Sequence, residues 1–224
     1  KILADIDGIP MVIRTAKAIE NIDDVLIATD SNEVINIAKQ FGYKAILTDT
    51  NHQSGTDRIF EAAKKIGLND NDIVINVQAD EPFIEEDVVR AVYELTKKNI
   101  SNEKIIMNSC YKLLSSSEAD DPNLVKVVIS KNGNALYFSR SKIPYPRDHH
   151  FDEFKGHIGI YGFSMKNLEI FCSLDASSIE HIEKLEQLRA LDNDYGISMI
   201  EVETNSFGID TQEDLDRALK FHIL

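Results

Sequence analysis

The sequence has only two cysteines, Cys110 and Cys172, and neither stands in a CxxC motif or at a Cys/His spacing typical of zinc ligands. This scarcity excludes a disulfide framework and gives no indication of a structural zinc. Cysteine usage of this kind is typical of a reducing compartment. We therefore expect a cytoplasmic protein.

Long apolar runs are also missing. No stretch approaches the roughly 20 apolar residues that a membrane-spanning helix requires, so we expect no membrane association. Hydrophobic residues make up 43% and charged residues 28% of the 224 residues, as is typical of soluble globular proteins. Length favours a single domain with one sizeable core.

Positive charge is in short supply. There are 24 lysines and arginines against 38 aspartates and glutamates, which gives a formal net charge of −14. Nucleic acids are bound by basic patches that neutralise several phosphates at once, so this balance argues against nucleic acid as the main partner. An anionic substrate would need metal ions to help bind it.

Helices and strands alternate through the first two-thirds of the chain. Pro10, followed by apolar residues at spacings of three and four, predicts a helix to about Asn21. Such alternation predicts a largely parallel sheet covered on both faces, that is, an α/β fold. The further strands predicted are residues 25–29, 44–47 and 73–77, and the further helices are 32–41, 56–66 and 85–98.

The pattern changes after residue 98. Segments 104–113, 124–129 and 135–139 are predicted strands joined by polar turns, which favours antiparallel pairing. Residues 143–150 (IPYPRDHH) carry two prolines and are predicted to form an exposed loop, as a lid or a subunit contact. The remaining predictions are strands at 157–163 and 197–202 and helices at 166–172, 179–191 and 211–221.

Open parallel sheets bind ligands just beyond the ends of their strands, and three aspartates are candidates for such positions. Asp30 follows the predicted strand 25–29, Asp80 lies in the segment 78–82 after the predicted strand 73–77, and Asp210 follows residues 207–209 just before the last predicted helix. Asp80 and Asp210 would suit Mg²⁺, which takes one or two carboxylates and completes its shell with water and substrate phosphates. Two alternatives stay open. Asp210 has the spacing of a helix cap, and Asp80 is also explained as a turn residue before Pro82.

Residues 51–58 (NHQSGTDR) gather hydroxyl groups, a glycine and an arginine at a predicted helix start. Free backbone N–H groups and the helix dipole favour an anion there, so this segment is a candidate nucleotide cradle. The alternative is an ordinary cap at Thr56 with Arg58 in solvent. Similarly, His157 on its strand is explained by a structural role, and residues 186–189 by a solvated helix face.

Eight segments in this order resemble the CMP-KDO synthetases, the 3-deoxy-manno-octulosonate (KDO) cytidylyltransferases. The resemblance spans nearly the whole chain. Besides residues 1–10, the segments are 51–58 (NHQSGTDR), 76–82 (NVQADEP), 123–128 (NLVKVV), 136–140 (LYFSR), 157–162 (HIGIYG), 179–189 (IEHIEKLEQLR) and 208–214 (GIDTQED).

The resemblance implies an α/β three-layer sandwich of the nucleotide-diphospho-sugar transferase type, with a mostly parallel mixed sheet. An antiparallel insertion at about residues 104–165 would serve the sugar pocket and a homodimer contact. The implied enzyme transfers CMP from CTP to KDO for lipopolysaccharide or capsule biosynthesis and releases pyrophosphate. The alternatives are another acidic-sugar nucleotidylyltransferase, such as a CMP-sialate synthetase, and a catalytically silent nucleotide-binding subunit.

Carried over by position, the resemblance assigns roles to individual side chains. Asp80 and Asp210 would hold Mg²⁺, and Lys1 would meet the CTP phosphates; these three are the candidate catalytic residues. The nucleotide would also meet Ser54, Gly55, Thr56 and Arg58. The sugar would meet Gln78, Arg140, His157, Tyr161, Glu186 and Gln187.

Three features depart from the family's pattern. The family begins with a strand and a phosphate-binding loop, and neither precedes Lys1, so we expect that this segment is missing from the chain. Residues 1–3 (KIL) stand for the usual Gly-Lys-Pro-Leu, and Ala79 replaces a common glycine. The stretch from 147 to 157 is shorter than in much of the family.

Overall fold

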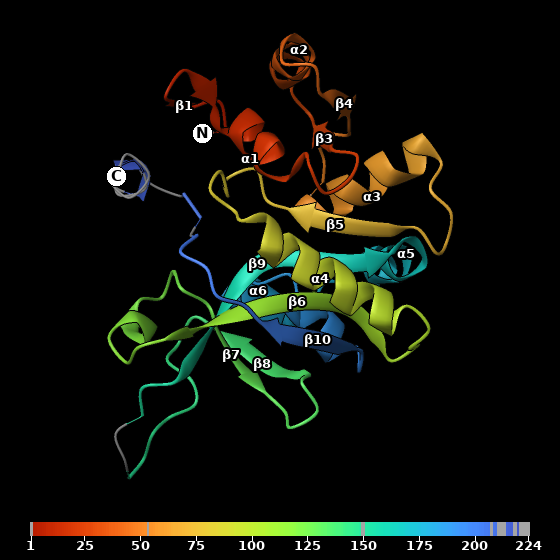
Figure 1. Cartoon of the computed structure of the whole chain (residues 1–224). Coiled ribbons are helices and arrows are strands. Elements are labelled where there is room, and N and C mark those ends of the chain that lie inside the picture. The colour runs from red at the N-terminus through yellow and green to blue at the C-terminus, as the bar shows by residue number, and fades with distance from the viewer. Residues whose placement is uncertain are drawn as a thin grey trace. The chain divides into compact units, whose positions relative to one another are not determined.

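The computed structural model in Figure 1 describes residues 2–52, 54–148, 151–206, 208–209, 214–216 and 219. The chain divides into two compact units. Unit 1 comprises residues 1–65, 77–90 and 204–224, and unit 2 comprises residues 66–76 and 91–203.

Unit 1 begins with a hairpin and a β-α-β segment. The antiparallel strands β1 (Asp5–Ile6) and β2 (Ile9–Pro10) lead into α1 (Met11–Ile19). Strands β3 (Leu26–Thr29) and β4 (Lys44–Leu47) pair in parallel and are joined by α2 (Asn32–Gln40). Helix α3 (Gly55–Ile66) and the first turn of α4 (Glu86–Asn99) complete the regular part.

Helix α2 illustrates how the local sequence determines the structure of unit 1. The Ser31 hydroxyl accepts the Val34 N–H and so caps the helix start. Val34 and Ala38, four residues apart, lie on one face of the helix and pack against Val12 and Ile27. The apolar spacing predicted from the sequence therefore builds the core between α1, α2 and β3.

Unit 2 is organised around a six-stranded mixed sheet. Strand β6 lies between a parallel neighbour, β10, and an antiparallel neighbour, β9, and β7 is antiparallel to both β8 and β9. Strand β5, whose first four residues belong to this unit, also pairs with β9. The strand bounds are β5 (Ile73–Val77), β6 (Ile105–Leu114), β7 (Lys126–Ile129), β8 (Ala135–Ser139), β9 (Phe154–Ser164) and β10 (Gly196–Glu201).

Helices pack closely on this sheet. A Cβ atom at Gly162 of β9 would lie 2.0 Å from the Thr96 hydroxyl of α4, so only glycine fits there. The remaining helical segments of this unit are η1 (Glu118–Asp120), α5 (Met165–Ser173), α6 (Ser178–Glu183) and α7 (Leu188–Asp192).

The predicted fold class is confirmed: the protein is a mixed α/β protein with a multi-strand mixed sheet. The strands predicted at 44–47, 73–77 and 135–139 match residue for residue. Antiparallel pairing in the middle of the chain is also observed. The role of residues 104–165 as an insertion stays a prediction.

One predicted helix is wrong. Residues 179–191 form two helices, α6 and α7, because Lys184 takes a left-handed conformation with φ of 55°. The Leu185 N–H then bonds to the Glu180 carbonyl and ends α6. Most of the helix predicted at 211–221 lies outside the described residues, although Asp214 to Asp216 are helical.

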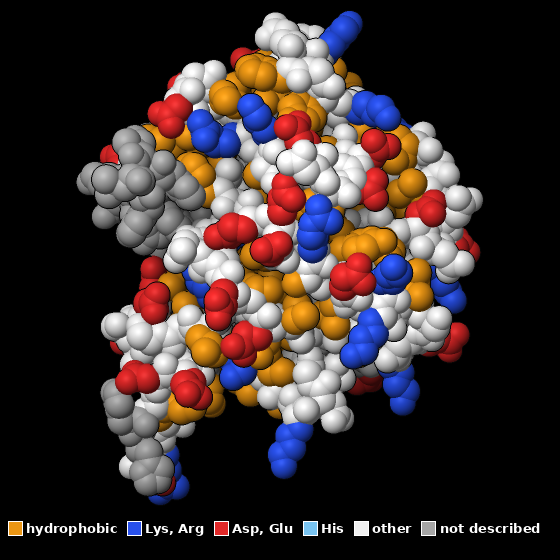
Figure 2. All heavy atoms as spheres, in the orientation of Figure 1, with side chains coloured by type: hydrophobic (Ala, Val, Ile, Leu, Met, Phe, Trp, Pro, Cys, Tyr) orange, Lys and Arg blue, Asp and Glu red, His pale blue; other side chains and the backbone are white. Residues whose placement is uncertain are grey.

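No helix within the described ranges is long and apolar enough to cross a membrane. On the face drawn in Figure 2, basic side chains lie interspersed with acidic ones.

Candidate active site

The turn after β5 holds Asp80 in a fixed position within unit 1. Its backbone is bonded on both sides: the Thr15 hydroxyl donates to the Ala79 carbonyl at 3.0 Å, and the Ile209 N–H donates to the Asp80 carbonyl at 2.9 Å. A further bond within the turn, from Glu81 N–H to the Gln78 carbonyl, closes it. The partly buried Asp80 therefore lies in a hydrogen-bonded turn at the carboxyl end of a strand.

Asp210 and Lys1 lie outside the described residues, so the predicted metal pair and the catalytic lysine stay predictions. Ile209, which precedes Asp210 in the sequence, is the residue bonded to Asp80. The Ser206 hydroxyl also donates to the Glu81 carboxylate at 3.0 Å. These two bonds join the segment before Asp210 to the turn that carries Asp80.

Carboxylate oxygens, such as those at this turn, are the ligands that Mg²⁺ prefers. In the part of the chain that the structure describes, no three His, Cys, Asp or Glu side chains are grouped to hold a metal. A Mg²⁺ ion shared between one or two carboxylates and substrate phosphates needs no such group. The donor set therefore fits Mg²⁺ held jointly with a nucleotide.

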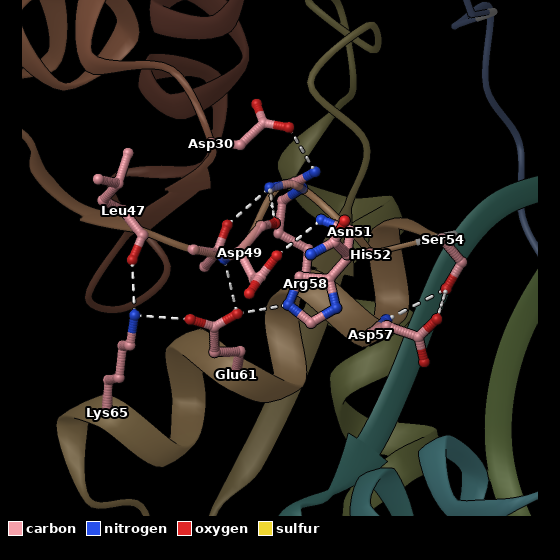
Figure 3. Close-up of polar contacts among 11 residues, drawn as sticks. Asp30, Leu47, Asp49, Asn51, His52, Ser54, Asp57, Arg58, Glu61 and Lys65 are labelled. Atoms are coloured by element: carbon pink, nitrogen blue, oxygen red, sulfur yellow. Dashed lines mark hydrogen bonds and ion pairs between the residues drawn. The ribbon is translucent and has the colours of Figure 1, made fainter.

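Arg58 links the ends of β3 and β4 (Figure 3). Its Nη2 contacts the Asp30 carboxylate at 2.8 Å, and its Nη1 donates to the Thr48 hydroxyl at 2.6 Å. The arginine side chain is only 19% exposed, so the alternative of a solvated Arg58 is wrong. Asp30, one of the three aspartates at strand ends, is thus the partner of this guanidinium.

The hydroxyl-rich turn before Arg58 is capped differently from the alternative considered above. The Ser54 hydroxyl accepts the Asp57 N–H at 3.2 Å and donates to the Asp57 carboxylate at 2.8 Å. Ser54 therefore caps α3, and Thr56 is fully buried inside the first turn. A Cβ atom at Gly55 would lie 3.2 Å from the Gln78 amide, so this glycine allows Gln78 to approach the turn closely.

Glu61 organises the same turn and was not singled out from the sequence. Its carboxylate accepts the Asp49 N–H at 2.9 Å, contacts the His52 ring and pairs with Lys65 at 2.6 Å (Figure 3). Bonding to Lys65, then to Asp49 and His52, lowers the pKa of Glu61 to about 2. The i,i+4 spacing of Glu61 and Lys65 was the available signal.

The other five residues predicted for the sugar belong to unit 2, whereas Gln78 belongs to unit 1. Three of them lie together. The Tyr161 hydroxyl donates to the Gln187 Oε1 at 3.2 Å, and the Gln187 Nε2 lies 3.5 Å from the His157 Nδ1. The ring of Phe138 packs edge-on against His157 at 4.9 Å between centroids.

Burial sets the charge state of this cluster. It lowers the pKa of His157 to about 3. Burial, with smaller contributions from Glu186 and Cys110, raises the pKa of Tyr161 well above its usual value. Both side chains are therefore neutral at pH 7 and present hydrogen-bonding groups without charge.

Arg140 is held at the end of β8. Its backbone N–H donates to the Glu183 carboxylate at 3.0 Å, and its Nε donates to the Glu183 carbonyl at 2.8 Å. The fully buried Lys126 donates to the Arg140 carbonyl at 2.6 Å. Lys126 and Glu183 were missed as individual residues, although both fall in segments that carry the family resemblance.

Residues 186–189 are not a solvated face, which corrects the alternative considered above. Gln187 and Arg189 are 1% and 6% exposed. Arg189 forms two bonds with the Glu180 carboxylate, at 2.7 and 3.0 Å. Arg189 of α7 thus pairs with Glu180 of α6 across the break at Lys184.

His157 gives a prediction for pH. In the unfolded chain its pKa is about 6.5, and in the folded protein it is about 3, so the unfolded state binds the proton first. The free energy of unfolding should therefore fall as the pH drops from 6.5 toward 3, and this group accounts for up to about 2 kcal/mol of that loss by pH 5. Urea titrations at pH 7 and pH 5 should show a smaller loss for His157→Gln; an equal loss would contradict the neutral buried ring.

Solved structures define the class of this fold. The chain is similar to a putative glucose-1-phosphate thymidylyltransferase from Bacillus anthracis, with 17% identity, a TM-score of 0.63 and coverage of 99% of this chain and 85% of that one. At this identity, the likeness shows the fold alone. A structure of CMP:2-keto-3-deoxy-manno-octonic acid synthetase complexed with CTP is more similar, at 35% identity and a TM-score of 0.87, and covers 100% and 91% of the two chains. The 35% identity to this synthetase over the whole chain places the chain in the class of nucleotidyltransferases.

Sequence comparisons narrow the class. Residues 1–199 match the family model described as cytidylyltransferase. The 3-deoxy-manno-octulosonate cytidylyltransferases of Nitratiruptor sp. and Wolinella succinogenes are 52% and 48% identical to the chain; the matches cover 97% and 98% of this chain and 91% and 92% of those relatives. The chain therefore belongs to the cytidylyltransferase family and is an enzyme.

Proposed function

We propose that the protein transfers CMP from CTP to the anomeric hydroxyl of KDO and releases pyrophosphate. The observation that carries this proposal is the 52% identity, over 97% of the chain, to a relative named 3-deoxy-manno-octulosonate cytidylyltransferase. A CMP-sialate synthetase and a silent subunit, the alternatives considered above, are not favoured by these relatives.

In this proposal, unit 1 binds the nucleotide. Arg58 and the capped turn of Ser54, Gly55 and Thr56 would meet CTP, and Lys1 would meet its phosphates. Asp80 and Asp210 would hold Mg²⁺, which supplies positive charge to the phosphates and promotes ionisation of the attacking hydroxyl. The bonds from Thr15 and Ile209 hold the backbone of the turn that carries the Asp80 carboxylate.

The sugar would be bound by two kinds of group in unit 2. The neutral cluster of His157, Tyr161 and Gln187 suits sugar hydroxyls, because it offers both donors and acceptors. Arg140 adds a cation suited to the sugar carboxylate. Gln78 and Glu186 complete the predicted set. Attack of the anomeric oxygen on the α-phosphorus would form the new P–O bond, and pyrophosphate would leave.

We further propose a cytoplasmic homodimer. The two cysteines are free, as in a reducing compartment. Apolar side chains are prominently exposed on unit 2: Leu136 is 59%, Ile182 is 79% and Tyr145 is 84% exposed. Exposed apolar groups of this kind suit a subunit contact. Sedimentation equilibrium should give twice the chain mass, and a monomer would contradict the dimer without affecting the reaction.

Pyrophosphate release tests the proposed substrate. The protein is incubated with CTP and Mg²⁺ together with KDO, its 8-amino analogue or N-acetylneuraminate, and a chelator control omits the metal. Metal-dependent release with KDO and none with N-acetylneuraminate is expected. Pyrophosphate release with N-acetylneuraminate alone would agree with the reaction class but contradict KDO as the sugar. No release with any of the sugars would contradict the proposed function.

Arg58→Lys should raise the KM for CTP by about tenfold or more. The two terminal guanidinium nitrogens of Arg58 bond to Asp30 and Thr48 at the same time, and the single ammonium group of lysine cannot replace both. The KM for KDO should change little. Arg90→Lys is the matched control, since that arginine is 49% exposed and has only long contacts, at 3.5 Å with the Glu86 carboxylate and at 3.4 Å with the Asn21 carbonyl. Equal effects of the two variants on the KM for CTP would argue against a nucleotide role for Arg58.

A further inference from the structure

Strand β9 is irregular where two predicted sugar-binding residues lie. Strands β6 and β9 pair Asn108 with Gly162 and Cys110 with Ile158. Only Ser109 lies between the two β6 positions, whereas residues 159–161 lie between the two β9 positions. Strand β9 therefore bulges opposite Ser109. Bulges next to active sites commonly re-aim side chains.

The bulge explains how His157 and Tyr161 come together. Residues four apart in a regular strand are separated by about 13 Å. The ring centroids of His157 and Tyr161 are 5.5 Å apart. The shortened path of β9 thus brings into one cluster two side chains that a regular strand would keep apart.

Ser109 occupies the space opposite the bulge and is fully buried. Its Oγ lies 2.7 Å from the Ile160 carbonyl oxygen, 3.3 Å from the Ile158 carbonyl oxygen and 2.9 Å from the His157 Nε2. A carbonyl oxygen only accepts, and a serine hydroxyl has one proton to donate. The hydroxyl therefore donates to Ile160, and the imidazole Nε2 must carry a proton and donate to Ser109.

The opposite side of the ring agrees with this assignment. The Tyr161 hydroxyl donates to the Gln187 Oε1, which turns the amide Nε2 toward the His157 Nδ1. An amide nitrogen only donates, so Nδ1 accepts. The hydrogen bonds then run in one direction, from Tyr161 through Gln187, His157 and Ser109 to the Ile160 carbonyl.

We propose that Ser109 is a positioning residue that holds His157 as the neutral tautomer with its proton on Nε2. Nδ1 is thereby kept as an acceptor facing Gln187 and Tyr161, the two other members of the predicted sugar cluster. The effect on sugar binding rests on the proposed function, whereas the tautomer does not. Ser109 belongs to unit 2 and none of the nucleotide candidates does, so its loss affects KDO rather than CTP.

The tautomer is measured directly on the unaltered protein. Two-dimensional ¹H–¹⁵N NMR with histidine labelled at the ring nitrogens, at pH 7, distinguishes a protonated from an unprotonated nitrogen. The His157 signals, assigned by their absence from His157→Gln, should show a protonated Nε2 and an unprotonated Nδ1. A proton on Nδ1, or on both nitrogens, overturns the proposal even if KDO is not the substrate.

Ser109→Ala tests the consequence. The variant should lose the single tautomer and raise the KM for KDO about fivefold to tenfold, with the KM for CTP and kcat little changed. Ser109→Thr, which retains the hydroxyl, should restore the tautomer. The matched control is Ser164→Ala, a buried serine that caps α5 and does not touch His157.

Ser164→Ala should leave the tautomer and both KM values as in the unaltered protein. An unchanged tautomer and KM for KDO in Ser109→Ala would overturn the proposal. If Ser109→Ala does not fold, the ¹H–¹⁵N spectrum of the unaltered protein alone tests whether Nε2 of His157 carries the proton. If the unaltered protein releases no pyrophosphate from CTP and KDO, the proposed function is overturned. The proposed tautomer of His157 is then still tested by the NMR spectrum.

Discussion

Asp80→Asn should lower kcat by at least about a thousandfold while the protein remains folded. The change replaces one carboxylate oxygen by an amide nitrogen and so removes a ligand suited to Mg²⁺. The bonds that fix this turn, from Thr15 to the Ala79 carbonyl and from Ile209 to the Asp80 carbonyl, involve only backbone oxygens of the turn. Both remain in the variant, so thermal unfolding should change little.

Asp87→Asn is the matched control for this experiment. Asp87 is an exposed aspartate in the first turn of α4, in the same unit as Asp80. It should keep normal turnover and lose at most a few tenths of a kcal/mol of stability. Normal turnover in Asp80→Asn, measured by pyrophosphate release, would remove Asp80 from the mechanism.

Arg189→Met should lower the free energy of unfolding by about 3–5 kcal/mol. The Arg189 and Glu180 side chains are 7% and 11% exposed and share two hydrogen bonds. Methionine fills much of the same space, but it leaves the Glu180 carboxylate buried without its cation. The remaining bond from the Ser177 N–H offsets only part of that cost.

The exposed pair of Arg90 and Glu86 provides the comparison. Their side chains are 49% and 35% exposed, so Arg90→Met should cost no more than about 0.5 kcal/mol. Urea unfolding curves for the two variants measure the difference. Equal losses would show that burial does not strengthen the Arg189 pair.

The elements that the sequence predicts well are those whose local pattern and tertiary role agree. Strand β5 is an apolar run, and it pairs with β9 in the sheet of unit 2. Helix α2 has a serine cap, an apolar face and a glycine after its end, and all three agree with its packing. Such elements can be located without any knowledge of their neighbours.

The break at Lys184 could not be predicted in this way. No glycine or proline marks it, and the charged residues around it suggest one amphipathic helix. After the break, Leu188 is buried and Arg189 pairs with Glu180 of the preceding helix. These contacts exist only after folding, so local propensity does not report them.

Some residues of the candidate site could likewise be named from the sequence, and others could not. Residues after strands, such as Asp30 and Asp80, follow from topology and could be named from the sequence. Ser109 could not, because it matters only through a bulge on another strand. Gln78 was named for the sugar, but its contact with Gly55 places it beside the predicted nucleotide turn. Its role stays a prediction.

The most direct test of the account is ³¹P NMR of the reaction of CTP with KDO in the presence of Mg²⁺. Attack on the α-phosphorus predicts two phosphorus products: a phosphodiester signal from CMP-KDO and an equal amount of pyrophosphate. Formation of CDP with a sugar phosphate, or of CMP without a sugar diester, would contradict transfer of CMP to KDO.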